Sequence, residues 1–205
     1  MVRNENHFPI RPLDFKKERQ MENRERKNWK EHFPTPIYTL SSFEIKLPRV
    51  DKLRTYYVLK SKDWVNVIPV TKDGKILLIN QYRHGIGEIS LELPGGIVDE
   101  EGQNYEAALI SAKRELREET GFTASDSDFE YLNKFSGNPA MFTNWSYSFI
   151  ARNVGETEPV EFDEGEDIEI LFATPQEVKG FLFDGKIHHP HMVAALGLYF
   201  LKYPT

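Results

Sequence analysis

Short runs of alternating apolar and polar residues, separated by turn residues, fill the chain between positions 38 and 93. Alternation with a period of two is typical of strands that bury one face. An Asp-Gly turn within positions 72–75 also predicts a hairpin. The strands expected in this region are Tyr38–Leu47, Leu53–Lys60, Trp64–Thr71, Ile76–Gln81 and Glu88–Leu93.

In the next segment the apolar residues recur with the period of a helix. Leu109, Ala112 and Leu116 form an apolar stripe, Asn104 is a suitable N-cap, and Gly121 stands where a helix usually ends. Strands and helices then alternate to the end of the chain, which predicts a mixed α/β (α+β) domain. The remaining expected elements are strands at Glu130–Phe135, Trp145–Ala151 and Ile168–Ala173, a short helix from Thr174 to about Gly185, and a final helix at His191–Tyr203.

The first 35 residues differ from the rest, because they are polar and highly charged. A helix is predicted over Asp14–Glu31, but its apolar content is thin, so it would be marginal alone. Two interpretations stay open: an arm that packs on another surface, such as a second subunit, or a disordered arm. We therefore divide the chain into an N-terminal arm with strands, 1–60, and a main domain, 61–205.

Composition excludes several classes of protein. The chain has no cysteine, which excludes disulfides, thiolate metal sites and a cysteine nucleophile. No apolar run approaches the roughly 20 residues of a membrane span, and the N-terminus lacks the apolar block of a secretory signal. We expect a cytoplasmic protein without a membrane partner.

The distribution of charge is more informative than its sum. The net charge of −6 argues against a protein that coats nucleic acid. Residues 1–35 carry nine basic and six acidic side chains, so the remainder is near −9. Its acidic residues gather at 99–119 and 161–169. Such clusters form either a solvated face or a site for hard cations.

Three glutamates stand within the last turns of the predicted helix. Glu115, Glu118 and Glu119 have the spacing i, i+3, i+4, so their carboxylates converge. They lie at the negative pole of the helix dipole and repel one another. A divalent cation with hard oxygen ligands, Mg²⁺ or Mn²⁺, would resolve this conflict. The alternative is an exposed helix end with paired charges, in which Arg114 reaches Glu118.

This stretch, RELREETGF at 114–122, resembles the second half of the Nudix box, G-x5-E-x7-R-E-U-x-E-E-x-G-U with U a bulky apolar residue. Glu106 also has the required spacing. One departure is the box glycine, since Glu100 stands where it should fall and Gly96 lies four residues too early. The loop that enters the helix is therefore longer by four residues.

The resemblance implies a Nudix fold, an α/β/α sandwich with a mixed sheet, that hydrolyses a nucleoside diphosphate linked to another group. It further implies two or three Mg²⁺ ions, with Mn²⁺ as a substitute. The implied metal ligands are Glu115 and Glu119, Glu118 as an accessory ligand in the catalytic centre, and a backbone carbonyl of Gly95 or Gly96.

Upstream, QYR at 81–83 and ELPGG at 92–96 resemble the ADP-ribose pyrophosphatase and nucleoside diphosphate sugar branch of this family. The branch implies that Arg83 contacts phosphate and Glu92 lines the site. Arg114 matches the arginine that orients a glutamate, and we group it with them as a substrate-binding residue. The alternative for Arg83 is a solvated strand edge.

Downstream, EFDEGEDIEILFATPQEV at 161–178 resembles the acidic loop of the same branch. That loop carries the general base, for which Glu164 and Glu166 are candidates, and Glu166 is also a candidate metal ligand. A loop can deliver a base to the attacking water once substrate and metal are bound. The resemblance covers roughly residues 38–203.

The branch commonly forms homodimers that exchange N-terminal strands, which suits the charged arm. The histidines at 188, 189 and 191 are either metal ligands or, more simply, the start of a helix around Pro190.

We therefore predict Mg²⁺-dependent hydrolysis of a nucleoside diphosphate sugar, such as ADP-ribose or GDP-mannose, to a nucleoside monophosphate and a sugar phosphate. The alternatives are another substrate (a nucleoside triphosphate, a dinucleoside polyphosphate or coenzyme A) and a non-catalytic sensor of nucleotide sugars.

Overall fold

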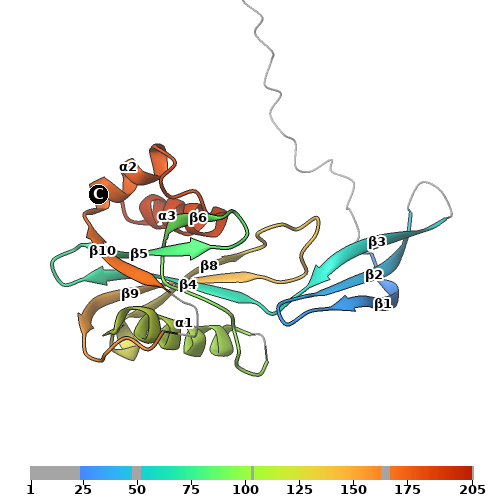
Figure 1. Ribbon diagram of the computed structural model, residues 1–205, viewed down its shortest axis with the longest axis horizontal. Helices are drawn as coiled ribbons and strands as arrows, with labels where there is room; N and C mark the ends of the chain where they lie inside the picture. The colour runs from blue at the N-terminus through green and yellow to red at the C-terminus, as the bar shows by residue number, and fades with distance from the viewer. Residues whose placement is uncertain (1–23, 48–51, 103, 163–166, 205) are drawn as a thin grey trace, which may run out of the picture.

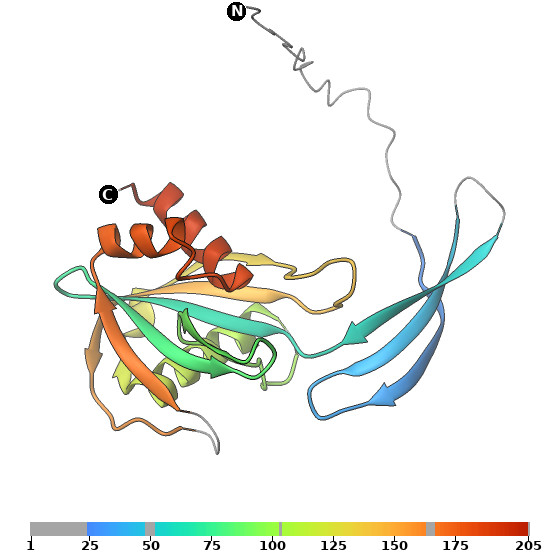
Figure 2. The same ribbon diagram turned by 45° about the horizontal axis from the view of Figure 1, so that its top comes forward.

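The computed structural model describes residues 24–47, 52–102, 104–162 and 167–204 (Figure 1). These residues form two β-sheets and three α-helices. The smaller sheet has three antiparallel strands in chain order and projects from the main body (Figure 2). Its strands are β1 (Lys27–Pro34), β2 (Thr39–Lys46) and β3 (Leu53–Lys60).

The larger sheet has seven strands and is mixed. Its main order is β10-β5-β4-β9-β7, with β6 beside β5 and β8 beside β9. Strands β4 and β9 run parallel, whereas the other described pairs are antiparallel. The strands are β4 (Trp64–Thr71), β5 (Ile76–Arg83), β6 (Glu88–Glu92), β7 (Phe122–Thr123), β8 (Phe129–Phe135), β9 (Ser146–Glu156) and β10 (Ile168–Ala173). The 3-10 turn η2 spans Asp126–Asp128.

Helices cover both faces of this sheet. Helix α1 (Tyr105–Thr120) lies on one face, and α2 (Pro175–Phe183) and α3 (Pro190–Lys202) lie on the other (Figure 1). The predicted α/β/α sandwich with a mixed sheet is confirmed. Each face has its own core: Leu116 packs in the cluster under α1, and Leu196 packs in the cluster under α3. Fully burying such a side chain stabilises the fold by about 1.5–3 kcal/mol.

The predicted helix over Asp14–Glu31 is wrong in its second half, since Lys27–Pro34 is strand β1; residues 14–23 lie outside the described part of the chain. Strand β1 pairs with β2, from Lys27 opposite Glu44 to Pro34 opposite Thr39. Trp29 packs on Phe43 of β2, with ring centroids 4.8 Å apart. Pairing and aromatic packing override the helical propensity of a charged segment.

The small sheet is connected to the main body by the chain between β3 and β4, and also by hydrogen bonds to the loop between β8 and β9. The backbone N–H of Leu59 in β3 donates to the carbonyl of Met141, and Thr143 N–H donates to the Leu59 carbonyl. The sheet still leaves large apolar side chains in solvent: Phe33 is 63% exposed and Tyr57 is 60% exposed.

The three histidines mark the start of α3. His189 is its N-cap, with its ring accepting from the His191 backbone at 3.3 Å, and Pro190 follows at the first helical position. His191 is buried, and its ring packs on Trp64 with centroids 5.0 Å apart. Helix capping therefore accounts for His189, and packing on Trp64 accounts for His191.

Helix lengths limit what these elements can span. The described helices have 16, 9 and 13 residues, and a membrane span takes roughly 20. Among the residues with described structure, no helix is long and apolar enough to cross a membrane.

Candidate active site

Helix α1 fixes the three glutamates of the box because both of its ends are capped. The Asn104 side chain accepts from Ala107 N–H at 2.9 Å. Gly121 has a left-handed backbone, with φ of 71°, and its N–H donates to the Arg117 carbonyl. Since Leu116 is fully buried under the sheet, the last turn cannot rotate, and its carboxylates keep their directions.

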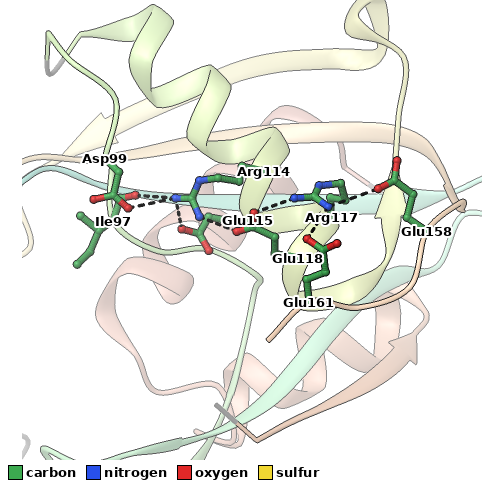
Figure 3. A network of polar contacts seen from close by, with 8 residues as sticks. All are labelled: Ile97, Asp99, Arg114, Glu115, Arg117, Glu118, Glu158 and Glu161. Atoms are coloured by element: carbon green, nitrogen blue, oxygen red, sulfur yellow. Dashed lines mark hydrogen bonds and ion pairs between the residues drawn. The ribbon is translucent and has the colours of Figure 1, made fainter. Parts of the chain in front are cut away.

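Arg114 is the centre of the site (Figure 3). Its Nη2 donates to Glu115 Oε1 at 2.6 Å, and its Nη1 donates to Glu118 Oε2 at 2.7 Å. The loop before the helix folds back on the same guanidinium, with the Ile97 carbonyl at 3.3 Å and Asp99 Oδ2 at 3.5 Å. Burial alone would lower the pKa of Arg114, but Glu115 and Glu118 raise it overall. The longer loop therefore supplies partners to the arginine.

Arg117 extends the network beyond the helix. Its Nη2 donates to Glu118 Oε1 at 2.8 Å, so that each oxygen of Glu118 receives one arginine. Its Nη1 donates to Glu161 Oε2 at 2.9 Å and to Glu158 Oε2 at 3.4 Å (Figure 3). The hydrogen bond with Glu161 is the main reason that the pKa of Arg117 lies above its ordinary value.

The third glutamate faces the glycine loop. Glu119 is 2% exposed, and its Oε2 accepts from Gly95 N–H at 2.7 Å. Gly96 lies against Glu115: a Cβ added there would stand 2.6 Å from Glu115 Cδ. The ELPGG segment and the box helix thus meet with no room for side chains between them.

This oxygen-rich site fits a hard cation. Carboxylates and backbone carbonyls are the ligands that Mg²⁺ and Mn²⁺ prefer. Within the described part of the chain, no group of three His, Asp or Glu side chains is already arranged to hold a metal. Arg114 instead forms hydrogen bonds with Glu115 and Glu118, and Arg117 forms one with Glu118, so the arginines separate these carboxylates. Val65 N–H donates to the Gly96 carbonyl at 2.9 Å, which favours the carbonyl of Gly95 as the backbone ligand.

A second arginine–carboxylate pair lies on the neighbouring β5–β6 hairpin. Arg83 Nε and Nη2 donate to the two oxygens of Glu92 at 2.9 and 2.7 Å, a bidentate contact. Glu92 is fully buried, whereas the Arg83 side chain is 36% exposed. Burial would raise the pKa of Glu92, but the hydrogen bonds and charge of Arg83 lower it overall. Glu92 therefore stays ionised and orients the guanidinium plane.

The predicted residues fall into three sets. Glu115, Glu118, Glu119, Arg114 and the two glycines come together, while Arg83 and Glu92 pair with each other. Glu164 and Glu166 lie outside the described residues. Sequence reasoning gave no role to the partners that come from other segments. These are Asp99, Glu158 and Glu161. Arg117, which binds the last two, is on α1 at a position where the motif accepts any residue, and it was also given no role.

The family model described as the NUDIX domain matches residues 60–196. This range is most of the chain and includes every residue of the candidate active site. The chain belongs to the Nudix family. Among curated Nudix relatives, an ADP-ribose pyrophosphatase of Bacillus subtilis is 30% identical over 71% of this chain and 75% of its own. The ADP compounds hydrolase NudE of Escherichia coli is 30% identical over 79% of this chain and 83% of its own.

The chain is also similar to another protein and to a solved structure. A methanol dehydrogenase activator of Bacillus methanolicus is 27% identical over 64% of this chain and 69% of its own. A crystal structure of an ADP compounds hydrolase matches with a TM-score of 0.74, covering 91% of this chain and 99% of that one. At 23% identity this match shows the Nudix fold alone. With its box carboxylates retained, the chain is a Nudix hydrolase.

Proposed function

We propose that this Nudix hydrolase cleaves the pyrophosphate bond of a nucleoside diphosphate sugar, such as ADP-ribose or GDP-mannose, in a reaction that depends on Mg²⁺ or Mn²⁺. The products are a nucleoside monophosphate and a sugar phosphate. One observation carries the proposal: Glu115 and Glu119 lie against the Gly95-Gly96 backbone at one end of α1, and Arg114 joins Glu118 to Glu115. The relatives named for ADP-ribose and ADP compounds support this substrate class.

The metal would be held by the box carboxylates and the Gly95 carbonyl. Two or three ions held there would supply charge neutralisation of the pyrophosphate and activation of water. The chain's own part is to hold the buried Glu119 side chain in place, through the Gly95 N–H, and to orient Glu115 and Glu118 through Arg114.

Arg83 would bind a phosphate of the substrate. Its guanidinium plane is fixed by Glu92, which is itself held in the sheet, so that little side-chain entropy remains to be lost on binding. The partial exposure of Arg83 gives a substrate access to it. The assignment of the general base to Glu164 or Glu166 stays a prediction from the family resemblance.

The test is a substrate panel with Mg²⁺, assayed for phosphate after a phosphatase is added. It should include ADP-ribose, GDP-mannose, nucleoside triphosphates, a dinucleoside polyphosphate and coenzyme A, with metal-free reactions as controls. We expect turnover of ADP-ribose or GDP-mannose but not of triphosphates. The reverse preference would overturn the substrate class, and Mg²⁺ binding without turnover of any nucleotide would indicate a sensor.

We also propose that the chain is a homodimer held by the small sheet. The sheet exposes Phe33 and Tyr57 together with Leu53, and a second copy would bury them. Light scattering after size exclusion should give twice the mass of one chain. A Phe33→Lys/Tyr57→Lys variant should be monomeric, whereas Lys46→Glu on the same sheet should leave the mass unchanged.

Location and the remaining partners stay predictions from composition. With a net charge of −6 we expect no binding to nucleic acid, and without cysteine a reducing compartment such as the cytoplasm suits the chain. Fractionation of the cells that express it and a gel-shift assay with duplex DNA would check both expectations.

A further inference from the structure

Arg117 occupies an oxygen of Glu118 that a metal would need. Its two terminal nitrogens have different partners: Nη2 is on Glu118 of the helix, and Nη1 is on the segment after β9 (Figure 3). A guanidinium and a divalent cation compete for the same carboxylate, because both are attracted to its charge and a cation beside another cation is repelled. Metal binding at Oε1 of Glu118 therefore requires Arg117 to give up that contact.

The segment after β9 offers Arg117 two other carboxylates. Glu161 is already at 2.9 Å and Glu158 at 3.4 Å, and both side chains are at least half exposed, so that either can follow the guanidinium. When Nη2 leaves Glu118, the arginine still has two acceptors and its charge stays neutralised.

These ion pairs are not what holds the segment in place. The backbone N–H of Glu161 donates to the Glu118 carbonyl at 2.9 Å, and those of Thr157 and Glu158 donate to the Gly121 carbonyl. A Cβ on Gly121 would also overlap the Glu158 carbonyl. Since exposed ion pairs contribute little to stability beside such contacts, the side chains of Arg117, Glu158 and Glu161 are available for another role.

We propose that Arg117 is a positioning residue that competes with the metal for Glu118, and that Glu158 and Glu161 weaken this competition by drawing Arg117 away. The inference rests on the proposed function, since it takes Glu118 as a metal ligand. It predicts that replacing Arg117 and replacing its two glutamate partners have opposite effects on the affinity for metal. Arg117→Gln should tighten metal binding, and Glu158→Gln/Glu161→Gln should weaken it, each by about three- to tenfold.

The test measures Mn²⁺ dissociation constants of the full chain, without substrate, by calorimetry and by the electron paramagnetic resonance signal of free Mn²⁺. Ionic strength is fixed, and thermal unfolding in chelator verifies the fold of each variant. Lys113→Gln is the matched control: it removes one positive charge from the same helix, where Lys113 pairs with Asp126 at 2.7 Å and not with a glutamate of the box. Its binding constant should stay within about twofold of wild type.

A triple variant separates competition from a general effect of charge. If the two glutamates act through Arg117, adding Glu158→Gln/Glu161→Gln to Arg117→Gln should change the Mn²⁺ affinity by less than about twofold. Additive effects, or weaker binding by Arg117→Gln, would overturn this inference and leave the metal site standing. A wild-type chain that binds no Mn²⁺ would overturn both the inference and the proposed metal-dependent function.

Discussion

The backbone N–H of Gly95 donates a 2.7 Å hydrogen bond to Oε2 of Glu119, 24 residues further along the chain. This bond joins the ELPGG segment to the box helix at the buried member of the three glutamates. Because Glu119 is 2% exposed and is bonded to the glycine backbone, its side chain has little freedom to turn away from the site.

Glu119→Gln should abolish most of the activity and keep the fold. The amide can still accept from Gly95 N–H, but it lacks the charge that a divalent ion requires. A metal in such a site contributes several kcal/mol to transition-state stabilisation, so we expect turnover to fall by about a thousandfold. The measurement is the steady-state rate with ADP-ribose and Mg²⁺. Glu101→Gln, the same substitution at an exposed glutamate in the loop before α1 where the box accepts any residue, should keep wild-type turnover. Full activity of Glu119→Gln would contradict the metal assignment.

The two glycines should respond differently to alanine. In Gly96→Ala the new Cβ meets the Glu115 carboxylate, the movable end of a side chain, so we expect a large loss of activity with less than about 1 kcal/mol lost in stability. In Gly95→Ala it meets the backbone of β4, 2.8 Å from Asn66 Cα, at a φ of 158°. That backbone cannot yield, so we expect a loss of about 2–4 kcal/mol.

Urea unfolding at pH 7 measures the stability of both variants, and circular dichroism verifies their folding. Equal losses of stability would show that the Glu115 side chain is as rigidly held as the β4 backbone.

Local patterns in the sequence predicted the elements whose causes are local. Helix α1 was predicted from its cap, its apolar stripe and Gly121, and β3, β4 and β10 were predicted with the observed ends. Strand β1 was missed because its partner β2 and the ring of Phe43, rather than its own residues, determine its conformation.

The site shows the same division. The spacing of the three glutamates placed them on one end of a helix, but the second partners of the arginines come from afar. Asp99 is 15 residues before Arg114, and Glu161 is 44 residues after Arg117. No periodicity connects such positions, because only the tertiary fold brings the segment after β9 and the loop before α1 to the same helix end.

Arg83→Ala should destabilise the fold, because it leaves the buried carboxylate of Glu92 without its arginine partner. Glu92 is fully buried and ionised, and breaking a buried pair by removing one partner costs about 3–5 kcal/mol. Because Arg83 is partly exposed, we expect a loss of about 2–3 kcal/mol in urea unfolding at pH 7. The double variant Arg83→Ala/Glu92→Gln carries no buried charge and should be more stable than Arg83→Ala alone. A double variant that is less stable would show that the carboxylate has other partners strong enough to keep it ionised.

Acid should destabilise the protein through His191 before it protonates most carboxylates. Burial lowers the pKa of His191 from 6.5 to about 4, so between these values the unfolded chain binds a proton that the folded chain does not. Stability from this residue is therefore complete above about pH 6.5 and is lost as the pH falls toward 4, by up to about 3 kcal/mol.

The measurement is the free energy of unfolding in urea at pH 7.5 and pH 5.0. His191→Gln should be less stable than wild type at pH 7.5, because the ring leaves its place between Trp64 and the Gly137 backbone, but it should lose less stability between the two pH values. His188→Gln, at an exposed histidine three residues earlier, should keep the wild-type difference. An unchanged pH dependence in His191→Gln would mean that the acid sensitivity lies elsewhere, with His189, whose pKa is also lowered by burial, as the next residue to replace.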